Sequence, residues 1–442
     1  MLRWLNSFKR FPYFLQHLYE KTTTSIAFVP SIMAAGFFLL TGLMIYLEQR
    51  GLTQWMGEHV PSFVIIKSWE VAQNILTTLV GALISLMVFS FSMVMVLLNN
   101  AASNYSPRVL PGLIANKFHQ FVLGTYLGTI TYCLLLVINV TPSQPNTPLP
   151  SFSILLGIFF GVTCLMLFVF FIHSISESVQ VDKILTVLKN KTLHNMKYGL
   201  LSKQSDVPLP ADASSWQTYP ADRSGYLVSI ALEDLQELCE KNELQINILI
   251  TQGAFTLEGL PLFSSNKTLD KELVHAIQEA LVFSENETVG SDYSKGFKQI
   301  NEIAVKAMSP GINDPGTAIA AINHLSILFK ERMKIKNTGA VILEKNEKER
   351  PAHIWPKTIL FGELLATALA PIRQYSRHDN TVVIKLLEMI YFLSKKENCN
   401  DNDQRAALKR EVAIWEIDTD EHITNKMDRQ LVKEYIEKIG LS

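Results

Sequence analysis

Charge is missing from four long stretches of this 442-residue sequence. The uncharged runs occupy residues 26–47, 71–98, 119–140 and 152–175, and all four are apolar. A bilayer-crossing helix needs about 20 such residues, and a buried helix of a water-soluble protein rarely continues this long without charge. The sequence therefore predicts four transmembrane helices. The first run is too long for a cleaved signal peptide, and it ends in YLEQRG instead of small residues.

Cysteine is scarce as well, and catalytic motifs are missing. The four cysteines, Cys133, Cys164, Cys239 and Cys399, have the spacing of neither a disulfide framework nor a zinc site. The chain contains no HExxH, no GxSxG and no phosphate loop, so no enzyme activity, cofactor or metal site is predicted. The acidic stretch 416–422 is interpreted as a solvated helix face, because its carboxylates spread around a helix axis.

The two parts of the chain differ in charge. Residues 1–204 carry 13 Lys and Arg against 6 Asp and Glu, whereas residues 205–442 carry 27 against 35. In the first part, the basic residues gather before the first run, between the second and third runs, and after the fourth run. Loops rich in Lys and Arg stay on the cytoplasmic side of a membrane. Both termini are therefore expected in the cytoplasm.

Apolar runs, prolines and charges divide the chain into five parts. We expect a cytosolic N-terminal segment at 1–25, a four-span transmembrane domain at 26–176, a basic juxtamembrane helix and linker at 177–224, a small αβ subdomain at 225–265, and a mainly helical cytosolic domain at 266–442. The predicted fold class is an α-helical integral membrane protein with four transmembrane helices and a mostly helical α+β cytosolic domain.

Alternation and helical spacing predict the elements of the cytosolic part. The predicted strands are 225–231, 244–252 and 255–263, with a strand or hairpin at 339–356. The predicted helices are 232–242, 268–283, 294–308, 315–335, 358–377, 380–396 and 401–438, the last broken near residue 424.

The second apolar run carries small and polar residues at alternating spacings of four and three. We call these residues the small-polar stripe: Asn74, Thr78, Gly81, Ser85, Val88, Ser92, Met95 and Asn99. A 3.5-residue period marks a helix-packing seam, and small residues let helices approach closely in lipid. In one interpretation, this span packs centrally among its own neighbours. In the other, copies from several subunits surround a polar pore.

The pore interpretation names a set of candidate lining residues: Asn74, Thr78, Gly81, Ser85, Ser92, Asn99 and Arg108. No Asp, Glu, Lys or Arg lies in the middle of a span, which argues against a proton-coupled carrier and favours a passive pore or a structural bundle. In the loop that follows, Arg108 is interpreted as an anchor at headgroup depth. The alternative is an intracellular pore mouth lined by Asn99, Asn100, Asn104 and Arg108.

The segment SPGINDP, residues 309–315, predicts a tight corner between two helices. Ser309 precedes a proline and is pushed away from helical angles. Gly311 is expected to take the left-handed conformation that reverses the chain. Asp314 is a favourable N-cap, and Pro315 is a favourable first helical residue.

A ligand site is the alternative interpretation of the same corner. Ser309, Asn313 and Thr317 add hydroxyl and amide groups beside a helix N-terminus, which favours an anion. The candidate ligand-binding set is Ser309, Gly311, Asn313, Asp314, Thr317 and Arg373. Turn chemistry alone already accounts for these residue types.

Three stretches together resemble a bacterial family of predicted membrane proteins, domain of unknown function 2254. They are FSFSMVMVLLNNAASNYSPRVL (89–110), TQGAFTLEGLPLF (251–263) and IAVKAMSPGINDPGTAI (303–319). The resemblance implies four spans and a cytosolic domain in a bacterial inner membrane, and it implies no activity. The chain departs from the family where an Arg-Thr pair followed by an Asp is common, because Glu287 precedes Thr288 here, with Asp292 after them.

These observations lead to two expectations for function. The first is a homo-oligomeric channel or passive transport pore lined by the second span, with a cytosolic assembly or regulatory domain. The second is a membrane-anchored scaffold or sensor whose cytosolic domain binds a partner or a small anionic ligand. Membrane lipid, a second copy of the chain and a small ion or anionic ligand are the expected partners, and nucleic acid is not.

Overall fold

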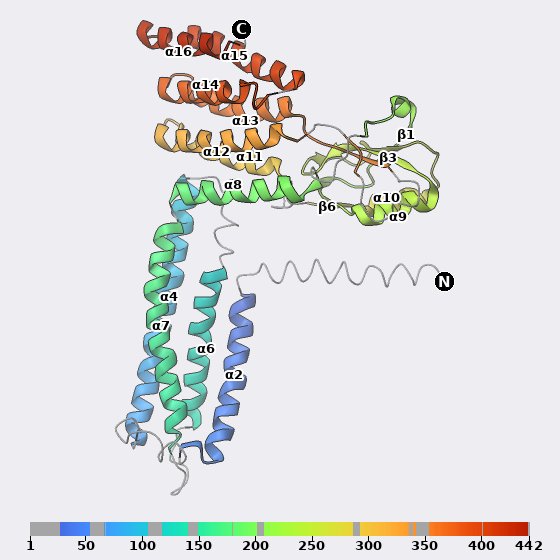
Figure 1. Cartoon of the computed structure of the whole chain (residues 1–442). Coiled ribbons are helices and arrows are strands. Elements are labelled where there is room, and N and C mark those ends of the chain that lie inside the picture. The colour runs from blue at the N-terminus through green and yellow to red at the C-terminus, as the bar shows by residue number, and fades with distance from the viewer. Residues whose placement is uncertain are drawn as a thin grey trace. The chain divides into compact units, whose positions relative to one another are not determined.

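The structure is a computed structural model, and it describes residues 27–53, 66, 68–104, 117–139, 149–178, 180–200, 207–285, 292–335, 339–341, 353–399 and 401–440. The described residues form two compact units, one reaching Gln180 and one beginning at Val181, with Asn104 grouped with the second. Figure 1 shows the helices of the first unit and the helices and sheets of the second.

Four long helices form the described part of the first unit. They are α2 (Phe28–Gln49), α4 (Trp69–Asn104), α6 (Lys117–Asn139) and α7 (Ser151–Ser178). Each is long and apolar enough to cross a membrane. The prediction of four membrane-spanning helices is confirmed.

Helix α6 is the most buried of the four, because its glycines allow α2 to pack closely against it. A Cβ on Gly124 would lie 2.5 Å from the Met33 sulfur, and a Cβ on Gly128 would overlap the Phe37 ring. Two tyrosines of α6, Tyr126 and Tyr132, are fully buried beside this contact. Small residues on α6 are thus used for packing inside the protomer.

A buried carboxylate ties the end of α2 to the start of α7. Glu48 is 8% exposed, and its Oε1 accepts hydrogen bonds from the Ser153 amide and the Ser153 hydroxyl, both at 3.0 Å. The Thr53 hydroxyl donates to Oε2 at 2.5 Å. Glu48 therefore stabilises the N-terminus of α7, where free amides and the helix dipole favour a negative charge.

Two small sheets begin the second unit. One has the strand order β1-β5-β3-β7 and the other β4-β2-β6. The strands are β1 (Gln217–Pro220), β2 (Gly225–Ile230), β3 (Gln245–Thr251), β4 (Phe255–Thr256), β5 (Pro261–Ser265), β6 (Leu281–Ser284) and β7 (His353–Lys357). Among the strand pairs that the structure describes, β3–β7 alone is parallel. Helices α9 (Leu232–Asn242) and α10 (Lys271–Ala280) pack on this part.

The sequence predictions for this part are wrong in three places. Residues 281–284 leave the predicted helix and pair with β2, because Leu281 and Phe283 fit the sheet. The predicted strand 255–263 is two short strands joined by a turn in which the Leu260 amide donates to the Leu257 carbonyl at 3.1 Å. Part of the expected linker is ordered, since β1 pairs with β5.

The remaining helices form stacked layers, visible in Figure 1 from α8 to α16. Helix α8 (Val181–Tyr198) packs on the pair α11 (Ser294–Ala307) and α12 (Pro315–Met333). That pair carries α13 (Phe361–Ser376) and α14 (Asn380–Ser394), which in turn carry α15 (Asn402–His422) and α16 (Lys426–Ile439). The predicted break near residue 424 is confirmed.

Candidate functional site

The small-polar stripe faces away from the rest of the protomer. Its candidate pore-lining members on α4 are all exposed: Asn74, Thr78, Gly81, Ser85, Ser92 and Asn99. The opposite face of α4 is buried and mostly apolar, with Ala72, Leu76, Val80 and Leu83 in the core of the helix bundle. The protomer therefore packs α4 by its apolar side and leaves the stripe uncovered.

Local geometry keeps the stripe open. A Cβ built on Gly81 would meet nothing within 4 Å. The Ser85 hydroxyl donates to the Gly81 carbonyl at 3.0 Å, so it is satisfied within its own helix and needs no partner from another one. Arg108, the remaining candidate, and the side chain of Asn104 lie outside the described residues.

The corner at 309–317 is built as a capped turn, in agreement with the predicted N-cap. Asp314 accepts a hydrogen bond from the Thr317 amide at 3.1 Å and from the Thr317 hydroxyl at 2.6 Å, and Pro315 begins α12. These two bonds hold the pKa of the Asp314 carboxyl below its usual value. A carboxylate thus already occupies the position that a bound anion would take at this helix N-terminus.

The residue that reverses the chain is different from the one expected. Asn313 has a φ of 49° and takes the left-handed conformation, whereas Gly311 does not have a positive φ. The expectation for Gly311 is therefore wrong. Asparagine adopts this region more readily than most residues. The turn is closed by the Asn313 amide, which donates to the Ser309 carbonyl at 2.9 Å, and by the Asp314 amide, which donates to the Ala307 carbonyl at 2.8 Å.

The other candidates of the corner have partners of their own. The Ser309 hydroxyl donates to the Lys306 carbonyl at 2.7 Å. Arg373 on α13 pairs with two carboxylates of α15, Glu411 at 3.2 Å and Asp418 at 3.2 Å. Burial raises the pKa of Glu411, and Arg373 opposes that shift. The Arg373 charge is thus compensated by α15.

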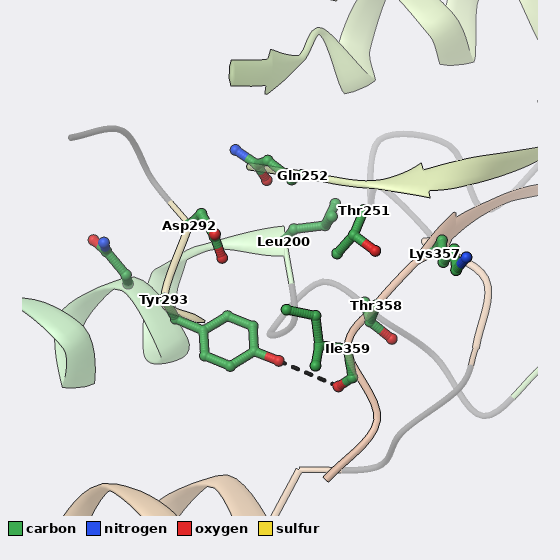
Figure 2. Close-up of a pocket in the computed structure, with 9 residues that line it drawn as sticks. Leu200, Thr251, Gln252, Asp292, Tyr293, Lys357, Thr358 and Ile359 are labelled. Carbon is green, nitrogen blue, oxygen red and sulfur yellow. Dashed lines mark hydrogen bonds between the residues drawn. The ribbon is translucent and has the colours of Figure 1, made fainter. Parts of the chain in front are cut away.

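A small pocket that the sequence did not reveal lies where α8, β3, α11 and β7 meet. Its lining residues are Asn195, Leu200, Thr251, Gln252, Asp292, Tyr293, Lys357, Thr358 and Ile359, shown in Figure 2. The cavity measures about 20 Å³, which suffices for a water molecule and not for an organic cofactor.

A fully buried arginine supports one wall of this pocket. Arg332 of α12 donates from Nη2 to the Ile359 carbonyl at 2.9 Å, from Nη1 to the Ile335 carbonyl at 3.0 Å and from Nε to the Tyr293 hydroxyl at 3.3 Å. The Tyr293 hydroxyl donates to the Ile359 carbonyl at 3.4 Å, the dashed line in Figure 2. Burial raises the pKa of Tyr293, against the effect of the nearby Arg332 charge.

Asp292 forms the neighbouring wall. It accepts hydrogen bonds from the Ser294 amide at 2.9 Å and the Ser294 hydroxyl at 2.6 Å. Gly253, with φ +87°, lies directly under its carboxylate, and a Cβ there would overlap Asp292. Glu287 and Thr288 lie outside the described residues. Among the residues that the structure describes, no three His, Cys, Asp or Glu side chains gather as metal ligands would.

Comparisons with known proteins agree with the membrane helices. The chain is 21% identical to an uncharacterized protein of Mycobacterium bovis and to one of Mycobacterium tuberculosis, in each case over 82% of this chain and 70% of the relative. No solved structure matches it. The model of a family described as "Predicted membrane protein (DUF2254)" matches residues 23–391. With that match over most of its length, the chain belongs to the family of predicted membrane proteins called domain of unknown function 2254.

Proposed function

We propose that the chain assembles as a homo-oligomer in a bacterial inner membrane, with both termini cytoplasmic, and that α4 of each copy lines a passive pore for small ions. One observation carries the proposal: the stripe Asn74, Thr78, Gly81, Ser85 and Ser92 is uncovered in the protomer, while the apolar face of α4 is buried. Large apolar residues such as Ile84, Phe91 and Val96 are exposed on α4 as well, so the stripe is a polar strip within a surface that otherwise suits lipid.

Polar side chains on a membrane span are better placed against protein or water than against lipid tails. The hydroxyls of the stripe lie along the middle of α4, and the amides of Asn74 and Asn99 lie toward its two ends. Small residues favour close packing of helices from another copy. A ring of copies satisfies both requirements, because the flanks of α4 pack on neighbours while the centre of the stripe meets water. The candidate lining set for this pore remains Asn74, Thr78, Gly81, Ser85, Ser92, Asn99 and Arg108.

Cysteine accessibility tests the proposal directly. All four native cysteines are buried, so they give a low background with a membrane-impermeant thiol reagent. In vesicles containing the full chain, we expect Thr78→Cys, Ser85→Cys and Ser92→Cys to react from the water phase. Ile84→Cys and Phe91→Cys are matched controls, because Ile84 and Phe91 are exposed on the same helix but off the stripe. We expect these two to stay unreactive in the bilayer.

Flux provides the second measurement. Ser85→Phe and Ser92→Phe should abolish ion flux into vesicles without changing the size of the assembly. Stripe cysteines that remain unreactive, together with a parent protein that conducts nothing, would overturn the pore. That result would leave the second expectation, a membrane-anchored scaffold or sensor whose C-terminal unit binds a partner or a small anionic ligand.

A further inference from the structure

Helix α8 has one face that is packed and one that is not. Its apolar face, which includes Ile184, Leu185 and Leu188, is buried against the first layer of the helical stack. Thr192 approaches α11 so closely that a Cβ on Gly296 would overlap it. Among the described helices of the second unit, α11 and α12 are the ones that pack on α8, so α8 is the terminal layer of this stack.

The opposite face of α8 is basic and partly apolar. We call it the outward face of α8, and its residues are Lys183, Val187, Asn190, His194, Lys197 and Tyr198. Val187 is 64% exposed and Tyr198 is 59% exposed. The ammonium of Lys197 lies 5.1 Å from the centre of the Tyr198 ring. This face carries no carboxylate, since Asp182, the acidic residue of α8, falls on its flank.

Additional positive charge lies at the edge of this face. Lys191 is exposed, and its pKa is lowered by partial burial and by the neighbouring charge of Lys295 on α11. In the part of the chain that the structure describes, no carboxylate forms an ion pair with Lys191 or Lys197. Uncompensated lysines beside an exposed aromatic ring suit an anionic, partly apolar surface.

Chain connectivity brings α8 to the membrane boundary. The apolar span of α7 ends at Ile175, α7 itself ends at Ser178, and α8 begins at Val181. Three Cα–Cα steps separate Ser178 from Val181, which limits the distance to about 11 Å. The first turn of α8 therefore lies within headgroup reach of the leaflet from which α7 emerges.

We propose that the outward face of α8 is a lipid-binding surface that lies along anionic phospholipid headgroups. The lysines meet the lipid phosphates, while Val187 and Tyr198 enter the interfacial layer, where tyrosine is favoured. Each lysine near an anionic leaflet strengthens such a contact by about fivefold, and salt weakens it. This surface is independent of whether α4 lines a pore.

A fluorescent label at His194→Cys tests the proposal in the full chain, reconstituted in lipid nanodiscs of two compositions. One contains phosphatidylcholine only, and the other also contains phosphatidylglycerol. Each includes a lipid with a quencher on its headgroup. We expect the label to be quenched more strongly in the anionic discs, and added salt to reverse the difference. Lys191→Gln together with Lys197→Gln should weaken the contact by about fivefold per lysine removed.

Matched controls separate this contact from a general effect of charge or folding. Lys409→Gln with Lys426→Gln removes the same charge from exposed positions of α15 and α16, and should leave the quenching at residue 194 unchanged. A label at Met427→Cys, 74% exposed in the parent, should stay unquenched in both discs. Equal quenching at residue 194 in neutral and anionic discs would overturn the proposal. Protection of the label from the quencher could instead depend on the number of chains per disc and not on lipid charge. That result would also overturn the proposal, and it would assign the outward face of α8 to contact with a second copy.

Discussion

Helices α6 and α4 both carry small residues at helix-packing spacing, and they use them in opposite ways. On α6, Gly124 and Gly128 are filled by Met33 and Phe37 of α2. On α4, Gly81 faces open space, and the residues around it on the stripe are exposed. The same sequence signature therefore has two outcomes: α6 completes the protomer, whereas α4 is left for something outside it. Substitutions at the packed glycines of α6 should lower the stability of the protomer, whereas substitutions on the small-polar stripe of α4 should leave it unchanged.

Gly128→Leu should have the largest effect on the protomer. Its Cβ would overlap the Phe37 ring, and overpacking of this kind costs on the order of 3 kcal/mol or more when the helices must separate. We expect a large loss of thermal stability and of monodispersity in detergent. Gly36→Leu on α2 is the matched control, because a Cβ at Gly36 meets nothing within 4 Å. Equal loss from both changes would contradict the tight contact at Gly128.

Arg332→Met tests the buried arginine of the C-terminal unit. The change removes the guanidinium donor from the Ile335 carbonyl and leaves the Ile359 carbonyl with only the longer Tyr293 bond, and an unsatisfied buried group costs about 1–3 kcal/mol. Thermal unfolding followed by tryptophan fluorescence should show the loss. Arg332→Lys should restore little of it, because an ammonium cannot reproduce the planar fork of donors. Full recovery with lysine would mean that charge alone matters at this position.

Asp314→Ala should cost about 1 kcal/mol, the usual contribution of an N-cap. For a unit of this size, that is a decrease of about 2–4 °C in Tm. Gly311→Ala should have almost no effect, since Gly311 lacks a positive φ and has open space around it. A larger loss at Gly311 than at Asp314 would be incompatible with the observed turn.

The Asp314 contribution also has a defined pH dependence. The folded-state pKa of this carboxyl is lowered below its unfolded value of 3.8. Its stabilising effect is therefore present above that value, and it is lost as the pH falls through the lower folded pKa. The difference in Tm between parent and Asp314→Ala should shrink over this acidic window and stay constant near neutral pH.

Gly81→Leu should have the smallest effect on the protomer. The added side chain enters open space on α4, so thermal stability of the detergent-solubilised monomer should change by less than about 0.5 kcal/mol. In the proposed pore the added side chain faces the water path, so ion flux into vesicles should fall while cross-linking in membranes shows an unchanged assembly. A destabilised monomer with normal flux would reverse the comparison between α4 and α6.

The sequence was sufficient for the elements whose pattern is dominated by one physical effect. The length of the uncharged apolar runs predicts the four spans, and Asp314 followed by Pro315 predicts the start of α12. The sequence was insufficient where contacts with distant parts of the chain determine the local conformation. Leu281–Ser284 continue a helical apolar pattern, yet they pair with β2. Gly311 and Asn313 can both take a left-handed turn, and only the closure of the corner selects Asn313.

The same limit applies to the candidate sites. Arg332 lies on an amphipathic helix among other charged residues, so nothing in the sequence indicates that it is fully buried. Gly253 and Asp292 are far apart in sequence, and the wall of the pocket that they form depends on the fold. For the stripe on α4, the sequence gives the spacing of small residues. Only the burial of Ala72, Leu76 and Leu83 in the core of the helix bundle reveals which side of α4 is packed and which remains uncovered.

Because helices α8 to α16 are stacked in layers, the helical part of the second unit should unfold from one end of the stack toward the other. Each layer of helices contacts mainly the next. As in repeat proteins, each layer is therefore stabilised by its nearest neighbours, and unfolding begins at a terminal layer. One end, α8, is anchored through α7. The other, α15 and α16, contacts no further layer among the described helices, and most of it lies beyond residue 391, where the family match stops. That last pair acts as a cap: it packs on α13 and α14, and its loss would expose this layer to solvent while the layers near α8 stay folded.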